Sequence, residues 1–197
     1  MLRFRILHRR TGSLLREVQG AALLEFAIVL PLLMVFVVGI FDFSGAFNQK
    51  QKIEQAAQEG AIIAGAQPMS DIASGNGDPD SLHPVVTAVF NSLVGSGVLA
   101  KGACVPPGIA VYVGPNPKLK WKYTISGCPD DLVVVIDRGW VATPASISTT
   151  IAVGTTVKVT YPYRWRFGSV IQLLFPGPNG YLTPTPVTES ATVHNQM

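Results

Sequence analysis

The chain has 197 residues, 48% of them hydrophobic, and a formal charge of +3 at pH 7. This length allows one domain with an anchor, and the mean hydropathy of +0.34 is high for a soluble domain. Five arginines lie within residues 1–20, and the rest of the chain is close to neutral. A nucleic-acid-binding protein would carry its Lys and Arg on a folded face with stacking aromatics, so we expect no nucleic-acid partner.

Residues 20–43 form an apolar run of membrane length that contains one carboxylate, Glu25, near its start. The stretch from Phe26 to Phe41 would rise about 24 Å as a helix, and residues 21–24 extend it to the roughly 30 Å of a hydrocarbon core. An ionisable side chain is costly in lipid, which makes Glu25 a functional candidate. The alternative for Glu25 is a carboxylate at the lipid interface, solvated or protonated.

The arginines before the apolar run predict the topology, because positive residues stay on the cytoplasmic side of a membrane. The nearest cations after the run, Lys50 and Lys52, are diluted by acidic residues. We therefore expect a basic cytoplasmic leader over residues 1–20, a transmembrane helix over 21–43 and an extracytoplasmic remainder. The alternative is an ordinary cleaved signal peptide, because Ser44-Gly45-Ala46 resembles a small-residue cleavage site.

Helical periodicity continues beyond the run over residues 44–66. The small residues Ala56, Gly60 and Ala64 repeat at four-residue spacing, a pattern that lets helices approach their neighbours closely. We expect this helix extension to pack through these residues, either on the chain's own sheet or on a neighbouring subunit.

The remaining sequence predicts a loop, a short helix and then a series of strands. Turn residues over 67–83 predict a loop, and apolar spacing predicts a helix over 84–94. From residue 105 the apolar period changes to two. Strands are expected at Ile109–Val113, Leu119–Ile125, Leu132–Ile136, Thr155–Tyr163 and Val187–His194. These elements predict an α+β fold, in which a long N-terminal helix packs on an antiparallel sheet of an 84–197 domain.

The two cysteines of the chain, Cys104 and Cys128, both lie outside the membrane in the predicted topology. An oxidising compartment makes a disulfide the expected state, closing a loop of about 25 residues. Two free thiols are the alternative. A zinc site is not expected, because neither cysteine has a histidine nearby.

Catalytic motifs are missing from the sequence. The histidines, His8, His83 and His194, are scattered, and no nucleophile–base pair, phosphate-binding glycine pattern or metal-ligand cluster is found. We therefore expect no enzymatic activity, no cofactor and no metal. An enzyme carried on a membrane anchor remains a disfavoured alternative.

Motifs between residues 20 and 61 resemble those of a known family. They are the Glu25-Phe26-Ala27 and Leu30-Pro31-Leu32 core, the exit Gly39-Ile40-Phe41-Asp42-Phe43, and the continuation Ala56-Ala57-Gln58-Glu59-Gly60-Ala61. This pattern resembles the TadE-like family, the pseudopilins or minor pilins of tight-adherence (Flp-type) pilus systems. Gln58 departs from the pattern, because the family often has Arg there. Residues 157–165 also resemble the strand that ends such domains.

The resemblance implies processing by a prepilin peptidase between Gly20 and Ala21, which makes Glu25 the fifth residue of the mature chain. In the family, a glutamate at this position is thought to set subunit register by pairing with a neighbour's terminal amine. Low dielectric strengthens such a pair. The implied partners are the peptidase, other pilins or pseudopilins, the assembly platform and membrane lipid. The implied location is the bacterial inner membrane as a single-pass protein, with incorporation into the pilus as a later step.

A second class of function shares the same anchor. It is a membrane-anchored binding or adhesin module that does not polymerise. A groove or an exposed apolar patch on residues 84–197 would favour binding, whereas contacts confined to the helix would favour assembly.

Overall fold

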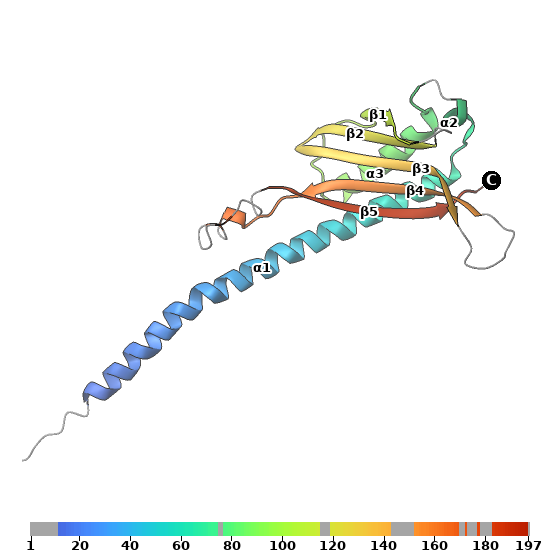
Figure 1. The fold of residues 1–197 in the computed structure, drawn as a ribbon. Helices are drawn as coiled ribbons and strands as arrows, with labels where there is room; N and C mark the ends of the chain where they lie inside the picture. The colour runs from blue at the N-terminus through green and yellow to red at the C-terminus, as the bar shows by residue number, and fades with distance from the viewer. Residues whose placement is uncertain are drawn as a thin grey trace, which may run out of the picture. The chain divides into compact units, whose positions relative to one another are not determined.

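The structure is a computed structural model that describes residues 12–74, 77–114, 119–142, 152–169, 172, 177 and 183–196. Its helical elements are α1 (Gly12–Ala66), α2 (Ser70–Ser74), the 3-10 turn η1 (Asp80–Leu82) and α3 (His83–Gly95). Its strands are β1 (Ile109–Tyr112), β2 (Lys120–Cys128), β3 (Asp130–Ala142), β4 (Ala152–Tyr163) and β5 (Thr185–His194). Figure 1 shows these elements along the chain. The chain divides into two units, residues 1–43 and residues 44–197.

The first unit contains the apolar part of α1. Most of its large apolar side chains are exposed, from 42% at Val37 to 70% at Leu23. A helix that is apolar on all sides belongs in a protein core or a membrane, and these side chains are not in a core. Within the described residues, one helix is long and apolar enough to cross a membrane, over Gly20–Ala66. The expected N-terminal apolar helix is therefore present.

The second unit is built on a five-stranded antiparallel sheet whose strands follow chain order from β1 to β5. Successive side chains of each strand point to opposite faces of the sheet, as the pairing between neighbouring strands shows. Val134 of β3 pairs with Val159 of β4 and both are buried, whereas Thr160 and Thr188 share a hydrogen bond of 2.9 Å on the opposite face. Residues 44–66 of α1 and helix α3 lie on the same side of the sheet (Figure 1). The predicted α+β fold is confirmed.

Each of the five predicted strands is present, but β3 extends to Ala142, beyond its predicted end at Ile136. Its inward alternation continues through Arg138, a buried charged residue that interrupts the apolar pattern in the sequence. The register then shifts between Asp137 and Trp140, where Asp137 Oδ1 accepts a hydrogen bond from the Gly139 amide at 3.0 Å. The strand continues after this irregularity, beyond the residues in which apolar side chains alternate.

The segment 67–83, predicted as a loop, contains α2 and η1. The prediction missed these short turns because they depend on a polar contact between residues ten positions apart. Asp71 accepts hydrogen bonds from the Ser81 amide at 2.7 Å and from the Ser81 hydroxyl at 2.8 Å. Helix α3 begins at His83, with Pro84 in its first turn, where proline fits a helix well.

The buried core joins α1, α3 and the inner face of the sheet. Its fully buried members include Ile53 of α1, Val85 and Leu93 of α3, and Ile125 of β2. The predicted disulfide is confirmed between Cys104 and Cys128, whose Cα atoms are 5.0 Å apart. It ties the segment after α3 to the end of β2.

Candidate functional site

The residues predicted to form the processing and register sites lie on the exposed surface of α1. Gly20, Ala21 and Glu25 are all helical and exposed. A Cβ built on Gly20 has no atom within 4 Å. Packing among the described residues therefore does not demand glycine at position 20, so a larger side chain there would test recognition by a partner.

The small-residue stripe of α1 packs on the chain's own domain. Ala56 and Ala64 are fully buried in the core, and Gly60 is buried beside them. A Cβ built on Gly60 would lie 2.5 Å from Val89 Cγ2 of α3 and 3.3 Å from Val157 Cγ1 of β4. Of the two partners considered for this stripe, the structure places it against the sheet and α3 of the same chain.

Polar contacts secure residues 44–66 of α1 along the β4–β5 side of the sheet. Gln49 Nε2 donates to the Pro162 carbonyl at 3.2 Å, and Lys50 Nζ lies 3.5 Å from Glu189 Oε1. Near the other end of the helix, the Gln196 amide donates to the Gly65 carbonyl at 3.0 Å. The helix extension is thus held at both ends.

Arg138 binds the backbone just after the end of α1. Its side chain is 1% exposed and donates from Nη2 to the Gln67 carbonyl at 2.7 Å and from Nη1 to the Pro68 carbonyl at 3.1 Å. Burial lowers the pKa of Arg138, and the negative charge of Asp71 partly opposes that shift. A cation is favourable at a helix C-terminus, where carbonyl groups lack helical partners. The sequence does contain a signal for Arg138. Every second residue of a strand lies on the same face, so Arg138 shares one face of β3 with Leu132, Val134 and Ile136.

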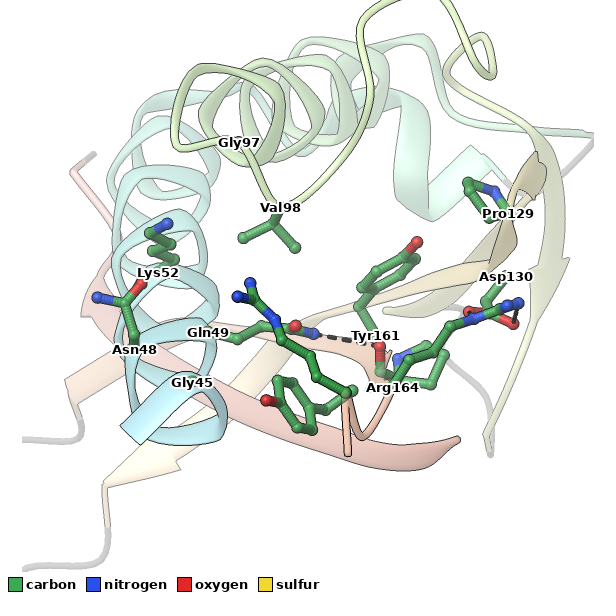
Figure 2. A pocket seen from close by; sticks show the side chains of 13 residues that line it. Gly45, Asn48, Gln49, Lys52, Gly97, Val98, Pro129, Asp130, Tyr161 and Arg164 are labelled. Carbon is green, nitrogen blue, oxygen red and sulfur yellow. Dashed lines mark hydrogen bonds and ion pairs between the residues drawn. The ribbon is translucent and has the colours of Figure 1, made fainter. Parts of the chain in front are cut away.

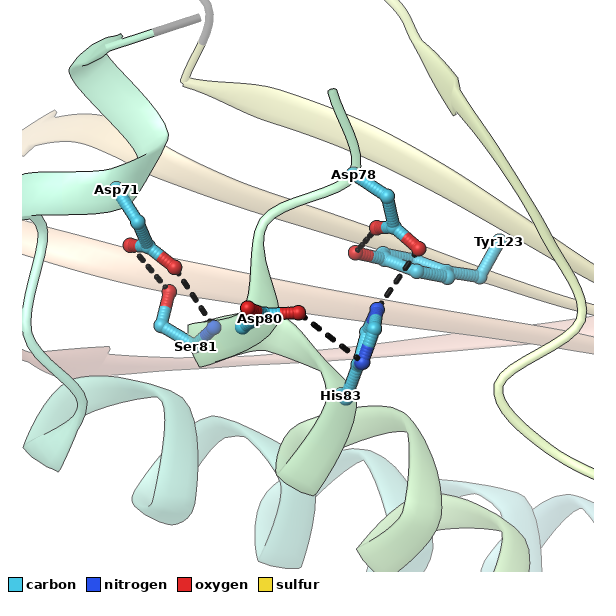
Figure 3. A network of polar contacts seen from close by, with 6 residues as sticks. All are labelled: Asp71, Asp78, Asp80, Ser81, His83 and Tyr123. Atoms are coloured by element: carbon cyan, nitrogen blue, oxygen red, sulfur yellow. Dashed lines mark hydrogen bonds and ion pairs between the residues drawn. The ribbon is translucent and has the colours of Figure 1, made fainter. Parts of the chain in front are cut away.

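A polar network holds the segment before α3 against β2 (Figure 3). Tyr123 donates to Asp78 Oδ1 at 2.6 Å, and His83 Nε2 lies 2.7 Å from Asp78 Oδ2. Burial raises the pKa of the Tyr123 hydroxyl, and the hydrogen bond and charge of Asp78 raise it further. Asp80 Oδ1 is 3.8 Å from His83 Nδ1. The part of the chain that the structure describes contains no group of three acidic, histidine or cysteine side chains placed to bind a metal.

Asp71 forms a second polar contact of this region through Ser81. Burial alone would raise the pKa of Asp71, but the two hydrogen bonds from Ser81, together with the backbone amides of Asp71 and Ile72, outweigh it and hold that pKa below its ordinary value of 3.8. Both contacts join residues of one connecting segment to each other or to the sheet, so they support the fold.

A cavity of about 460 Å³ lies between α1, the segment after α3, and the end of β4 (Figure 2). Its lining is mostly polar and comprises Gly45, Asn48, Gln49, Lys52, Gly97, Val98, Pro129, Asp130, Tyr161, Pro162, Tyr163, Arg164 and Arg166. Figure 2 shows Asn48, Gln49 and Lys52 on one side of the cavity and Asp130 with Arg164 on the other. No pattern in the sequence indicates this cavity, because its residues come from four separate segments.

The cavity contains a well-formed ion pair. Arg164 donates two hydrogen bonds to the Asp130 carboxylate, one from Nε at 2.7 Å and one from the terminal nitrogen Nη2 at 2.8 Å. The Arg164 guanidinium lowers the pKa of Asp130. Tyr161 is also fixed, since its hydroxyl donates to the Cys128 carbonyl at 2.5 Å.

A family model described as TadE-like protein matches residues 20–61. These residues form a TadE-like segment. The match confirms the resemblance predicted from the motifs, and it covers less than a quarter of the chain. No curated protein and no solved structure gives a significant match.

The TadE-like segment indicates a protein associated with a tight-adherence (Tad) pilus, with partners in that pilus system. It lies entirely within α1 and includes both the exposed apolar helix and the buried stripe around Gly60. The apolar helix is consistent with a single-pass membrane anchor. The sheet and most of the cavity lie outside the matched residues.

Proposed function

We propose that the chain is a minor pilin or pseudopilin that takes part in assembly of a Tad (Flp-type) pilus. One observation carries this proposal. The TadE-like segment is an exposed apolar helix with a carboxylate, Glu25, near its start. A plain anchor needs only apolar side chains, and a carboxylate in lipid is costly unless it has a partner.

In the proposed function, a prepilin peptidase cleaves between Gly20 and Ala21 and removes the basic leader. Glu25 then stands five residues from the start of the mature chain, close to the new terminal amine of a neighbouring subunit. In low dielectric this pair of opposite charges attracts strongly and fixes the register of adjacent helices. Helices in lipid associate by close packing and polar contacts, because apolar side chains gain little by leaving acyl chains.

The proposed location is the bacterial inner membrane, with the N-terminus in the cytoplasm and the sheet domain outside. The arginines before the span support this orientation through the positive-inside rule. The Cys104–Cys128 disulfide supports an oxidising compartment for the domain. We propose a structural role, without enzymatic activity.

The test of the assembly role is pilus yield at equal protein level in cells that carry Glu25→Ala. Membrane insertion and folding should be unchanged, while pilus yield and incorporation of this subunit should fall. Glu54→Ala is the matched control, because it removes an exposed carboxylate from the same helix outside the apolar part. Normal pili with normal incorporation of the Glu25→Ala chain would remove the register role.

Processing is tested separately by intact-mass analysis of the protein from its native host. The wild-type chain should begin at Ala21, and Gly20→Leu should leave the leader attached. Gly39→Leu is the control, since a Cβ at either glycine meets no atom within 4 Å. A mature chain that begins near Phe47 would instead identify an ordinary signal peptidase and contradict the pilin assignment.

The second candidate function is a membrane-anchored binding or adhesin module that does not polymerise. The polar cavity between α1 and the end of β4 favours this alternative, because assembly through helices alone would not need it. Cells that adhere normally with Glu25→Ala, but lose adherence when the cavity is altered, would favour the binding module.

A further inference from the structure

The end of β4 lies beside the residues of α1 that directly follow the apolar unit. That unit ends at Phe43, and Gly45 follows two residues later. A Cβ built on Gly45 would stand 2.5 Å from the Tyr163 hydroxyl oxygen, so the tyrosine side chain lies against this turn of the helix. Two residues of helix rise only about 3 Å. Where the apolar unit spans a membrane, chain connectivity therefore brings Tyr163 close to the surface of that membrane.

The residues that continue from Tyr163 are of the types found at membrane interfaces. Residues 163–167 read Tyr-Arg-Trp-Arg-Phe. The rings of Tyr163 and Trp165 meet edge to face with centroids 5.3 Å apart, and the Trp165 indole donates to the Thr185 hydroxyl at 2.9 Å. Trp165 is partly exposed, and Phe167 is 37% exposed. Tryptophan and tyrosine gather at interfaces because each ring is apolar and carries one polar group, and arginine is an interfacial anchor as well.

The helix itself presents an aromatic side chain at the same level. Phe47 is 62% exposed, although it follows the apolar unit. It is two residues from Gly45, which is about 200° around a helix, so Phe47 projects away from the side that faces Tyr163. Aromatic side chains therefore lie on both sides of α1 just after its apolar part.

The opposite end of the sheet lies far from this point and provides a comparison. A Cβ built on Gly65 would be 3.1 Å from the His194 carbonyl oxygen, and the His194 ring centroid lies 6.3 Å from that of Trp140. Gly45 and Gly65 are 20 residues apart on one helix, which corresponds to about 30 Å. The domain therefore has one tryptophan near each end of residues 44–66.

We propose that residues 163–167 contact the lipid headgroup region of the membrane that the apolar part of α1 spans, with Trp165 and Phe167 inserted at the interface. This contact belongs to the subunit in the membrane, before assembly. It rests on the membrane anchor of the proposed function and adds a second, separate contact with lipid. Two points of attachment restrict the tilt of the domain relative to the bilayer.

The experiment measures quenching of tryptophan fluorescence by brominated lipid, using the full chain in vesicles of phosphatidylcholine and phosphatidylglycerol. In the test vesicles the phosphatidylcholine carries bromine near the headgroup end of its acyl chains, and the reference vesicles contain no bromine. The three tryptophans of the chain, Trp121, Trp140 and Trp165, all lie outside the apolar unit, so quenching by lipid reports on the domain. A carbonate wash first removes protein whose helix is not inserted.

We expect weaker emission in brominated than in reference vesicles for the wild-type chain and for Trp140→Phe. Trp165→Phe should lose this difference, and the phenylalanine keeps an aromatic ring beside Tyr163. Trp140→Phe leaves Trp165 unaltered together with Trp121, which is only 5% exposed. It therefore tests the assignment even where Trp165→Phe does not fold.

Three outcomes would each overturn the proposal. Equal emission in the two kinds of vesicle from the washed wild-type chain would remove the interfacial contact and leave the anchor in place. A difference that disappears in Trp140→Phe and persists in Trp165→Phe would put the other end of the sheet on the membrane. Loss of the chain in the carbonate wash would remove the anchor, and with it both this contact and the proposed function.

Discussion

Gly60 of α1 lies directly against Val89 of α3, so closely that a Cβ on the glycine would stand 2.5 Å from Val89 Cγ2. Val157 Cγ1 of β4 would be 3.3 Å from the same Cβ. The helix extension can approach the core at this distance only because position 60 has no side chain. The small residues Ala56, Gly60 and Ala64 have the spacing found at helix interfaces in membranes, but here they pack inside this domain.

Gly60→Ala should destabilise the domain, because both neighbours are β-branched side chains with little freedom to move aside. Overpacking of this kind costs about 1–3 kcal/mol in the free energy of unfolding. The measurement is denaturant unfolding of the full chain in detergent micelles, followed by tryptophan fluorescence. Gly95→Ala is the control at the end of α3, where a Cβ meets nothing within 4 Å. Equal stability of the two variants would contradict the packing described for Gly60.

Arg138→Met should lower the free energy of unfolding by about 1–3 kcal/mol, because it leaves the Gln67 and Pro68 carbonyls without their charged donor. Arg164→Met is the comparison. That side chain is 61% exposed in its pair with Asp130, and exposed ion pairs contribute little to stability because water and salt screen them. The same unfolding assay ranks the two variants. A larger loss for Arg164→Met would show that the buried guanidinium does not hold the end of α1.

Asp71 should make stability depend on pH in the acid range. Its pKa in the folded chain lies below the ordinary value of 3.8, because the hydrogen bonds from Ser81 and from the backbone amides of Asp71 and Ile72 together outweigh burial. The stabilisation is therefore complete above pH 3.8 and is lost as pH falls through the folded pKa. In unfolding curves measured from pH 2 to pH 7, Asp71→Asn should be less stable at neutral pH and should lose less stability on acidification.

Asp130→Asn provides the comparison for Asp71, since the pKa of Asp130 is lowered by a different partner, Arg164. This variant keeps the Asp71 contribution, so its stability should still decrease below pH 3.8. If Asp71→Asn loses stability on acidification as steeply as the wild type, the Ser81 contacts do not carry the effect.

Removal of the disulfide should weaken the domain by about 3–4 kcal/mol in the chain-entropy model for a loop of about 25 residues. The variant to compare is the double substitution Cys104→Ser and Cys128→Ser, measured against the oxidised wild type in the unfolding assay. Non-reducing peptide mapping of protein from the native host should recover the linked peptides. Recovery of both cysteines as free thiols would argue against an oxidising compartment.

The proposed topology predicts opposite reactivity for two introduced cysteines in intact cells. Cysteine at Ser13 should resist a membrane-impermeant thiol reagent, and cysteine at Ser190, which is exposed on β5, should react. The physical basis is the positive charge before the span, which favours the cytoplasmic side. The reverse pattern would overturn the orientation and the compartment assigned to the domain.

The strands and the apolar helix could be predicted from local patterns. Alternation from Thr155 to Tyr161 is a property of neighbouring residues, and so is the apolar run before Phe43; each indicates its element without long-range information. The family resemblance rests on the same local stretch, residues 20–61. The two cysteines could be paired because there was only one way to join them.

The tertiary structure decided which surfaces meet. Small residues at four-residue spacing fit a neighbouring helix and the chain's own sheet equally well, and only the positions of Val89 and Val157 resolve that choice for Gly60. Arg138 reaches the end of α1 across about 70 residues of sequence, and Lys52 and Arg166 line one cavity from segments far apart in the chain. Periodicity shows which face of each helix or strand is apolar. Which of these faces pack together depends on the energy of packing the whole chain, and no single segment determines that energy.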